Sequence, residues 1–325
     1  MRAVVCKEFG PPEKLVIEEI DAPTPAPGEV LIDVKASAVT FPDCLMIEDK
    51  YQFKAAPPFV PGSEVGGVVA ALGEGVEGFA VGDRVVGSLG LVGGFAEQAV
   101  AAASGTRLIP EGAGLAESTG LLYAYGTGYY GLKHRAALQP GETLLVLGAG
   151  GNVGIAAVEL GVLMGARVIA AASSEEKLAL CRARGAAETI NYTTESLKDR
   201  AKELTGGKGV DVVFDAVGGD YAEAAIRAIG WGGRFLVVGF TAGIPKVPLN
   251  LALLKSCQIV GVFLGAMVSR EPDTRDGIVR DLLEFTASGK LEPHISRRYS
   301  LDEAPQALRD LMDRKAVGRV VIEPS

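Results

Sequence analysis

The chain is poor in the residues that build metal centres and disulfide frameworks. Its 325 residues include two histidines and four cysteines. The cysteines form no C-x-x-C pair and have no cluster of histidines beside them; they are Cys6, Cys44, Cys181 and Cys257. This spacing argues against a disulfide framework and against a structural zinc site. Cys44 has no partner in the sequence, and we interpret it as a small buried apolar residue.

Basic clusters and long apolar runs are missing as well. The formal net charge is −8, from 32 Lys and Arg against 40 Asp and Glu, and no run of basic residues would form a nucleic-acid footprint. No apolar run reaches membrane-spanning length without an interrupting glycine or charge. The N-terminal MRAVVCKEFG lacks the apolar core of a signal peptide. We therefore expect a cytoplasmic protein that binds neither nucleic acid nor membranes.

What the chain does contain is enough apolar material for two folded domains. It is too long for one ordinary hydrophobic core, and its 48% hydrophobic and 22% charged residues are typical of a globular protein. Glycine is abundant, with 43 residues, so many tight turns and close backbone approaches are expected.

Residues 1–110 are predicted to be rich in β-strands. Short apolar segments are separated by Pro and Gly clusters, such as residues 23–28, and the turn signals recur about every ten residues. This spacing is typical of a compact β-barrel or sandwich. The expected strands carry the sequences RAVVCKE, KLVIEEI, EVLIDVKASAV, EVGGVVAALG, RVVGS and FAEQAV.

The pattern changes after Glu111. Residues 115–136 are predicted to form a helix, after which strands and helices alternate. Near-continuous apolar strands that alternate with helices predict an α/β fold with a buried, doubly wound parallel sheet. The expected strands are 143–148, 167–172, 188–190, 210–216, 233–239 and 258–262, and the clearest helices are 153–164, 175–184 and 221–229.

The C-terminal segment does not continue this alternation. A helix at 272–288, a strand at 294–299, a helix at 302–314 and the strand VGRVVIE are expected there. We predict that this tail packs on the N-terminal β domain and makes that domain discontinuous. The predicted organisation is therefore a β domain at 1–122, a dinucleotide-binding domain at 123–264, and a return to the β domain at 265–325.

A glycine-rich turn, GAGGNVG at 148–154, follows the strand TLLVLG and opens a helix. Residues without a Cβ permit the tight turn and the close approach of backbone to a diphosphate, and the helix N-terminus offers free N–H groups to the anion. A glycine pattern alone is weak, but the strand before it and the helix after it are what a dinucleotide site needs. The residues expected to contact the dinucleotide here are Gly148, Gly151, Asn152, Val153 and Gly154.

The end of the next strand indicates which dinucleotide is bound. NAD sites usually place an acid there to bind the ribose 2′-hydroxyl, whereas this strand ends in Ser173 and Ser174, with Lys177 shortly after. Hydroxyls and a lysine favour a 2′-phosphate, so we predict NADPH as the cofactor. The same residues also read as a helix N-cap with acidic residues in the first turn, and both functions are compatible. Tyr192 could lie over the phosphate, or could be a surface aromatic.

Taken together, these motifs resemble the medium-chain dehydrogenase/reductase superfamily, specifically its zinc-independent NADPH:quinone oxidoreductase branch. The resemblance covers nearly the whole chain. Its further landmarks are PGSE at 61–64, VGGVV at 65–69, VGDRV at 81–85, GFAE at 94–97, SSEEK at 173–177 and GRVV at 318–321.

The resemblance implies a Rossmann domain plus a chaperonin-10-like β domain, with the active site in the cleft between them. It also implies a homodimer joined through the edge of the Rossmann sheet, with QIVGVFLG as the joining strand. Zinc-dependent relatives hold their metal at positions that match Thr40, Ser63 and Tyr123 here, and none of these is a good zinc ligand.

Three residues are the candidates for catalysis. Thr40 stands where quinone oxidoreductases often carry Asn, and it is expected to donate a hydrogen bond to the substrate carbonyl or the cofactor. The hydroxyl of Tyr51 is protonated at neutral pH and could donate a proton, although a packing role is equally open. Thr127 matches the family threonine near the nicotinamide, and its alternative is a hydrogen bond to its own helix.

The resemblance also points to residues that line the nicotinamide pocket. These expected cofactor contacts are Val217, Gly239, Phe240, Phe263 and Gly265. Neither His134 nor His294 is assigned a catalytic role, so no histidine general base is predicted.

The predicted function is an NADPH-dependent reductase that transfers hydride to a quinone or a small α,β-unsaturated carbonyl. Without a Lewis acid, the small-molecule substrate must already be electrophilic. An enoyl-CoA reductase of the acryloyl-CoA type remains an alternative. A different class, an NADPH-binding redox sensor or structural protein with little turnover, is also open.

Overall fold

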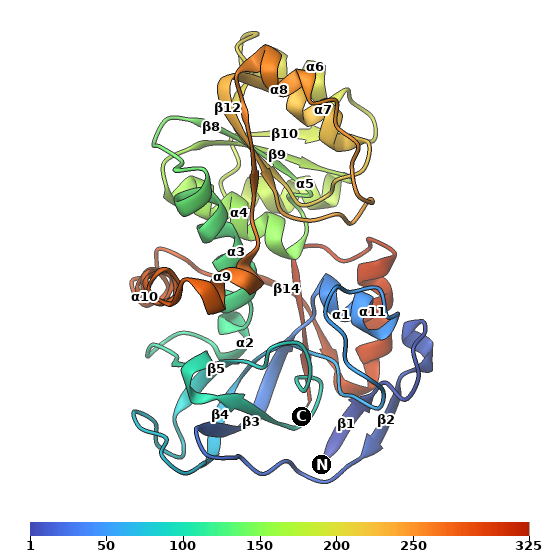
Figure 1. Ribbon diagram of the computed structural model, residues 1–325, viewed down its shortest axis with the longest axis vertical. Helices are drawn as coiled ribbons and strands as arrows, with labels where there is room; N and C mark the ends of the chain where they lie inside the picture. The colour runs from blue at the N-terminus through green and yellow to red at the C-terminus, as the bar shows by residue number, and fades with distance from the viewer. Residues whose placement is uncertain (325) are drawn as a thin grey trace. The chain divides into compact units, whose positions relative to one another are not determined.

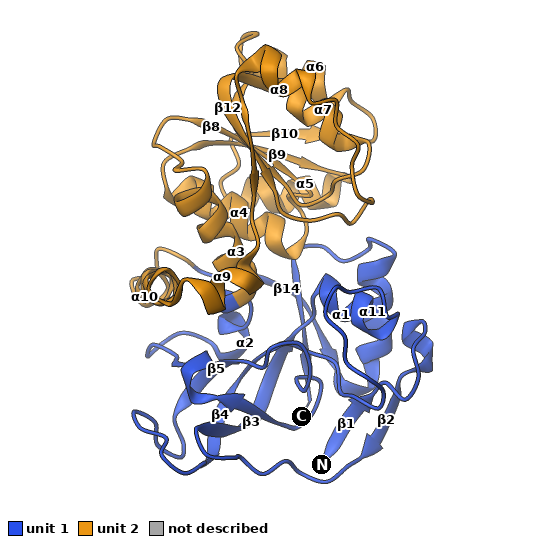
Figure 2. Ribbon diagram, viewed as in Figure 1, with its two compact units in different colours: residues 1–122, 292–325 blue, residues 123–291 orange. Residues whose placement is uncertain are grey.

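The computed structural model describes residues 1–324, and these form two compact units (Figure 2). The first unit contains residues 1–122 together with the chain from Glu292 onward, and the second contains Tyr123–Leu291. Both ends of the chain therefore contribute to one unit, as a discontinuous β domain requires. In the described part of the chain, no helix combines the length and apolarity needed to span a membrane.

The first unit is built on strands that pair antiparallel, except for the parallel pair β14 and β15 (Figure 1). β1 (Arg2–Val5) pairs with β2 (Val16–Glu19), and a larger sheet has the order β14-β15-β3-β4-β5-β7, with β6 also paired to β3. Its strands are β3 (Glu29–Ala38), β4 (Glu64–Leu72), β5 (Arg84–Ser88), β6 (Gln98–Ala102), β7 (Thr106–Leu108), β14 (Ile295–Ser300) and β15 (Arg319–Glu323).

Few helices cover this sheet. α1 (Phe41–Ile47) packs against α11 (Ala304–Met312), and α2 (Leu115–Ser118) contacts β3 and β4. Three short 3₁₀ turns complete the unit, at Pro12–Lys14, Ala103–Gly105 and Leu301–Glu303. The last strand inserts beside the N-terminal segment, because Val321 of β15 pairs with Ala38 of β3.

The second unit is a six-stranded parallel sheet with the order β10-β9-β8-β11-β12-β13. The chain starts in the middle of the sheet, runs to one edge, returns to the middle and runs to the other edge, which is the doubly wound Rossmann order. Its strands are β8 (Thr143–Leu147), β9 (Arg167–Ala172), β10 (Glu188–Asn191), β11 (Val210–Asp215), β12 (Ile229–Val237) and β13 (Gln258–Gly261).

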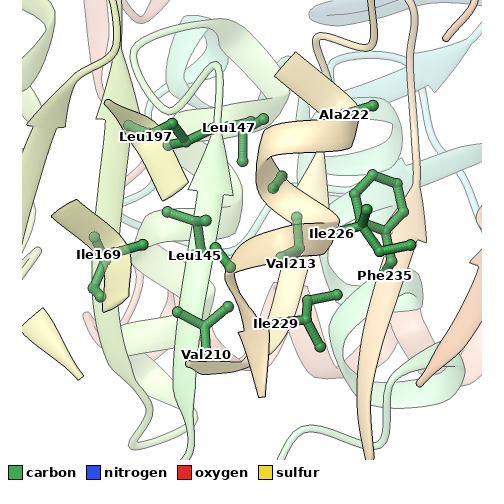
Figure 3. Packing of buried hydrophobic residues seen from close by; sticks show 14 of the residues in the cluster. Leu145, Leu147, Ile169, Leu197, Val210, Val213, Ala222, Ile226, Ile229 and Phe235 are labelled. Carbon is green, nitrogen blue, oxygen red and sulfur yellow. The ribbon is translucent and has the colours of Figure 1, made fainter. Parts of the chain in front are cut away.

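Helices cover both faces of this sheet, as alternating side chains of β8 show. Leu145 and Leu147 pack in a buried cluster with residues of α6 (Leu197–Leu204), α7 (Tyr221–Ala228) and α8 (Asn250–Lys255) (Figure 3). Leu144 points to the other face, where it lies against Gly161 of α4 (Asn152–Leu163). α5 (Glu175–Ala183) contacts β9 and β10.

The elements predicted for this sheet and its helices are confirmed, with most ends within about two residues. β12 is the exception, because it begins at Ile229 rather than at residue 233. In the C-terminal segment, the helix predicted at 302–314 is a 3₁₀ turn followed by α11.

The continuous helix predicted at 115–136 is wrong. α2 ends at Ser118, Thr119 is extended, and Gly120 adopts a left-handed φ of +85°. The helix resumes as a π-helical segment at Leu121–Tyr125, α3 (Gly126–Tyr129) and a second π-helical segment at Tyr130–Arg135.

The break has a tertiary cause. The Glu64 carboxylate accepts hydrogen bonds from the backbone N–H groups of Gly120 and Leu122, at 2.7 and 3.1 Å. The buried Arg319 guanidinium lies on the other side of the same turn, where it donates to the carbonyl oxygen of Glu117. Both partners are distant in sequence, so helical periodicity could not reveal them.

The predicted return to the β domain at residue 265 also differs from the structure, which keeps residues 265–291 with the second unit. Two helices follow β13, α9 (Leu264–Arg270), which was not predicted, and α10 (Pro272–Ala287). α10 is tied to α3 and the segment after it, because Asp281 accepts a hydrogen bond from the Tyr129 hydroxyl at 2.8 Å and pairs with Lys133 at 2.9 Å. These side-chain contacts hold the helix on the Rossmann unit.

Gly120→Ala is expected to destabilise the protein more than Gly112→Ala. Both glycines have nearly the same left-handed φ, +85° and +86°, so both substitutions carry about 1–2 kcal/mol of backbone strain. A Cβ on Gly120 would also lie 2.8 Å from Arg319 Nε, whereas nothing lies within 4 Å of one on Gly112. Chemical denaturation should show an additional loss of about 1–3 kcal/mol for Gly120→Ala. Equal losses would contradict the proposed crowding.

Candidate functional site

The glycine-rich turn of the second unit excludes side chains at two positions. Gly148 follows β8 with a left-handed φ of +69°, and a Cβ there would lie 2.8 Å from Val217 Cγ2. A Cβ on Gly154 would lie 2.1 Å from the carbonyl oxygen of Gly148. Only glycine at both positions permits α4 to start this close to β8, as the sequence predicted.

The outer side of the turn is open by comparison. A Cβ on Gly151 would meet nothing nearer than the Gly148 oxygen, at 3.4 Å. The next residue, Asn152, begins α4, and its side-chain oxygen is buried without a hydrogen-bond partner. The first N–H groups of an α-helix have no partner within the helix. An open backbone surface, an unpaired polar atom and a helix N-terminus thus coincide, and they fit a bound diphosphate.

The residues predicted to read the ribose 2′ position lie at the end of β9. Ser174 is the N-cap of α5 and accepts a hydrogen bond from the Lys177 backbone N–H at 3.4 Å, so the capping interpretation is confirmed. The Lys177 stem lies against the glycine turn, because a Cβ on Gly150 would be 2.4 Å from Lys177 Cβ. Glu175 is exposed and pairs with Arg182.

Two further predicted cofactor residues lie after neighbouring strands. Tyr192 follows β10 and its ring packs against Tyr221, with 4.5 Å between the ring centroids. Val217 follows β11 and its backbone carbonyl accepts a hydrogen bond from Ala242 at 2.8 Å.

Asp215, which the sequence reading missed, holds the turn after β11. Its carboxylate accepts hydrogen bonds from the backbone N–H groups of Val217 and Gly218, each at 2.9 Å. Burial raises the pKa of this carboxyl group, and the two hydrogen bonds act in the opposite direction. An acid at the end of the apolar strand VVFD was the available signal.

The remaining residues predicted to line the nicotinamide pocket are more exposed. Phe240 lies beside this turn, since a Cβ on Gly218 would be 3.2 Å from the Phe240 ring, and 46% of its surface is accessible. Phe263, at the start of α9, is 49% accessible, and Gly265 follows it. Gly239 is half-buried near the start of the loop after β12.

In the first unit, Thr40 is not the free donor that the sequence suggested. Both its hydroxyl and its backbone N–H donate to Asp43 Oδ2, each at 2.7 Å, and both residues are 1% exposed. Burial raises the pKa of Asp43 to about 6, with the hydrogen bonds from Thr40 and Gly62 acting against it. The Thr40 hydroxyl proton is therefore committed to Asp43 whenever that carboxyl group is ionised. The Thr-x-x-Asp spacing of a capping box was the signal that sequence reasoning did not use.

The other two catalytic candidates have different surroundings. Tyr51 is half-buried, packs on the apolar core of the first unit, and has its ring 6.1 Å from that of Phe53. In the second unit, the Thr127 hydroxyl donates to the Tyr123 carbonyl at 2.7 Å, which is the intrahelical bond given above as its alternative.

Unpaired buried polar atoms are rare in the described residues. Besides the Asn152 oxygen, they are Arg184 Nε, Glu188 Oε2 and the Ser63 hydroxyl. Arg184 and Glu188 have ion-pair partners, Glu159 and Arg167. Ser63 has only its hydroxyl, so its polar group is entirely without a hydrogen bond.

The donor set does not fit a zinc ion. Across residues 1–324, no cluster of three or more His, Cys, Asp or Glu side chains could hold a metal. The positions that match zinc ligands in relatives are occupied by Thr40, Ser63 and the half-buried Tyr123. The Thr40 hydroxyl already donates a hydrogen bond to Asp43. Cys44 is 1% exposed, as expected of a core residue, with its sulfur 3.7 Å from the Leu308 carbonyl oxygen.

Comparison with known proteins places the whole chain in one family. Residues 26–111 match the alcohol dehydrogenase GroES-like domain, and residues 152–281 match the family described as zinc-binding dehydrogenase. The chain is 41% identical to the quinone oxidoreductase-like protein 2 homolog of Nematostella vectensis, over 99% of this chain and 88% of that protein.

Solved structures agree over the full length. A probable oxidoreductase from Mycobacterium abscessus superposes with a TM-score of 0.92 at 36% identity, covering 100% of this chain and 99% of that one. Escherichia coli quinone oxidoreductase, solved in complex with NADPH, superposes with a TM-score of 0.89 at 26% identity, covering 100% of both chains. The chain belongs to the quinone oxidoreductase-like branch of the medium-chain dehydrogenase/reductase superfamily.

Proposed function

We propose that this protein is an NADPH-dependent reductase that transfers hydride to a quinone or a small α,β-unsaturated carbonyl without a metal ion. The observation that carries the proposal is the turn at 148–154, which has an open face at Gly151 and an unpaired Asn152 oxygen at the start of α4. The similarity to E. coli quinone oxidoreductase, solved with NADPH, supports the choice of cofactor.

Two groups of residues would bind two different parts of the cofactor. The glycine turn and the N-terminus of α4 would hold the diphosphate, with Val153 beside Asn152 in the first helical turn. Ser173, Ser174 and Lys177 would hold the 2′-phosphate, because no carboxylate stands at the end of β9 to repel it. When bound, NADPH supplies the hydride.

The exposed aromatic side chains support the second half of the site. Phe240 and Phe263 have about half of their surface accessible, so they can cover an apolar ring and exclude water from it. Burying this surface on a ligand would stabilise the complex, at roughly 25 cal/mol per Å² of apolar area.

The substrate that accepts the hydride must itself be electrophilic. Since the donor set does not fit zinc, no Lewis acid is assigned, and the substrate must be a conjugated carbonyl or a quinone. Negative charge develops on the carbonyl oxygen as hydride arrives at carbon, so a hydrogen-bond donor there accelerates the reaction. Tyr51 is the proposed proton donor that completes the product.

Steady-state oxidation of NADPH with a panel of acceptors tests this function. Turnover with quinones or simple enones, and little with acryloyl-CoA, is the expected pattern. Preference for the thioester would instead identify the enoyl-CoA reductase that the family resemblance leaves open. Tight NADPH binding without turnover of any acceptor would indicate a sensor or structural role and would contradict the reductase.

Lys177→Met is expected to weaken NADPH binding by about 10- to 100-fold, the value of one hydrogen bond to a charged group, and to leave NADH binding unchanged. Methionine keeps the stem that packs on Gly150 and removes only the charge. Titration of cofactor fluorescence measures both affinities, with the exposed Lys208→Met as the matched control. Equal losses for NADPH and NADH would refute the assignment of Lys177 to the 2′-phosphate.

Asp43→Asn is expected to remove a pH dependence of stability. The folded protein holds the Asp43 proton up to about pH 6, above the ordinary value of 3.8, so it binds more protons than the unfolded chain between these values. Stability contributed by this group is present below the lower value and is lost as pH rises through about 6, by roughly 1–3 kcal/mol. Urea denaturation of both proteins from pH 4 to 7.5 measures the difference. Parallel curves would show that Asp43 does not titrate in this range.

We also propose that the second unit pairs with a second copy of itself along β13. This strand is at the sheet edge, with β12 as its only neighbour in the sheet. Besides Phe240 and Phe263, which are assigned above to the cofactor, six of the fourteen exposed large apolar side chains of the described residues fall in the segment 244–268 that contains β13: Ile244, Leu249, Leu253, Leu254, Ile259 and Val268. An unpaired edge and an apolar surface in one segment favour self-association.

Ile259→Asp is expected to convert the dimer to a monomer, because it places a charge within the proposed contact. Light scattering after gel filtration measures the mass. Val81→Asp is the control, since Val81 is also exposed, at 66%, but belongs to the first unit. A monomeric parent protein, or dissociation by both substitutions, would reject this interface.

A further inference from the structure

Among the unpaired buried polar groups of the described residues, the Ser63 hydroxyl is the one whose place in the fold is not explained by a partner. Ser63 is 7% exposed, and its oxygen is fully enclosed without a hydrogen-bond partner. A buried hydroxyl normally finds a partner, because it loses its hydrogen bonds to water on folding. Among the described residues, none uses the hydrogen-bonding capacity of this hydroxyl, which is the observation that the following inference explains.

Ser63 lies next to the pair formed by Thr40 and Asp43. The backbone N–H of Gly62, its neighbour in sequence, is hydrogen-bonded to the Asp43 carboxylate. The Ser63 carbonyl accepts a hydrogen bond from the Leu89 N–H at 2.8 Å, which fixes the backbone at this point. Backbone hydrogen bonds thus hold residues 62 and 63 beside Asp43, the partner of Thr40.

The hydroxyls of Thr40, Thr127 and Ser63 differ in whether they can donate a hydrogen bond to a ligand. Thr40 donates its proton to Asp43, and Thr127 donates to the Tyr123 carbonyl, so each can only accept from a ligand. The proton of Ser63 has no acceptor among residues 1–324. Of these three hydroxyls, Ser63 alone can donate to a carbonyl oxygen without breaking an existing hydrogen bond.

We propose that Ser63 is a catalytic residue that donates a hydrogen bond to the carbonyl oxygen of the quinone or enone. This inference rests on the proposed function and corrects the donor role assigned to Thr40. Hydride brings two electrons and forms the new C–H bond, while the displaced π pair moves onto the oxygen that Ser63 contacts. A proton from Tyr51 or water then gives the saturated carbonyl from an enone. From a quinone it gives an adduct that tautomerises to the hydroquinone as the proton on the reduced ring carbon moves to oxygen; in both cases Ser63 keeps its own proton.

Ser63→Ala tests this role because the substitution should lower the activity without lowering the stability of the protein. We expect kcat/KM for the quinone to fall about 10- to 100-fold, with NADPH affinity unchanged. The thermal midpoint should stay the same or rise, because the removed hydroxyl has no partner in the free protein.

Ser37→Ala is the matched control. Ser37 is a fully buried serine in the same unit, but its hydroxyl donates to the Glu64 carbonyl at 3.2 Å. Its loss should lower the thermal midpoint by about 2–4 °C, the usual shift for one lost hydrogen bond in a domain of this size, and leave kcat/KM unchanged.

The outcomes distinguish this inference from the proposed function. If the parent protein reduces quinones and Ser63→Ala does so equally well, Ser63 is not the donor, and only this inference fails. A lower thermal midpoint for Ser63→Ala would show that the hydroxyl has a structural partner, such as a buried water, and would also overturn it. If the parent protein reduces no acceptor, the proposed function itself fails.

Discussion

The second unit depends on the close approach of Gly154 to the carbonyl oxygen of Gly148, which leaves no room for a side chain at residue 154. This approach sets how closely α4 follows β8 and therefore where its N-terminus points. The same turn brings Gly150 under the stem of Lys177 and leaves the outer side of Gly151 open. Backbone packing thus places the N-terminus of α4, the Asn152 side chain and the stem of Lys177 around one turn, to which we assign the diphosphate of the proposed cofactor.

The first unit contributes hydroxyl groups whose role depends on the acceptor to which each donates its proton. Asp43 takes both donors of Thr40, and Asp215 in the second unit takes two backbone donors in the same manner. These buried carboxylates hold the turns that they close, because each accepts hydrogen bonds from two donors of its own turn. The hydroxyl of Ser63 differs from both, since the folded chain gives it no acceptor.

Local sequence signals were sufficient for the Rossmann sheet and its glycine turn. The strand, the turn and the helix around residues 143–163 each have their own pattern, and the patterns agree with one another. The break at Gly120 could not be predicted this way, because it is produced by Glu64 and Arg319, which come from distant strands. The same applies to α10, which stays on the second unit through Asp281 and its contacts to Tyr129 and Lys133.

The candidate site was predicted less completely than the fold. The family resemblance pointed to Thr40 and Thr127, and the strand-end pattern pointed to the serines after β9. The role of a hydroxyl depends on its hydrogen-bond partner, which the sequence alone does not show. Asp43 was within reach of sequence reasoning through its capping-box spacing, whereas the isolation of Ser63 became apparent only once its surroundings were known.

The most direct measurement is a calorimetric titration of the purified protein with NADPH and, separately, with NADH. We predict one site per chain that binds NADPH at least about tenfold more tightly, because the 2′-phosphate adds a charge-assisted contact at the end of β9. Absence of binding for both coenzymes, or tighter binding of NADH, would contradict the assignment of this turn to a phosphorylated dinucleotide.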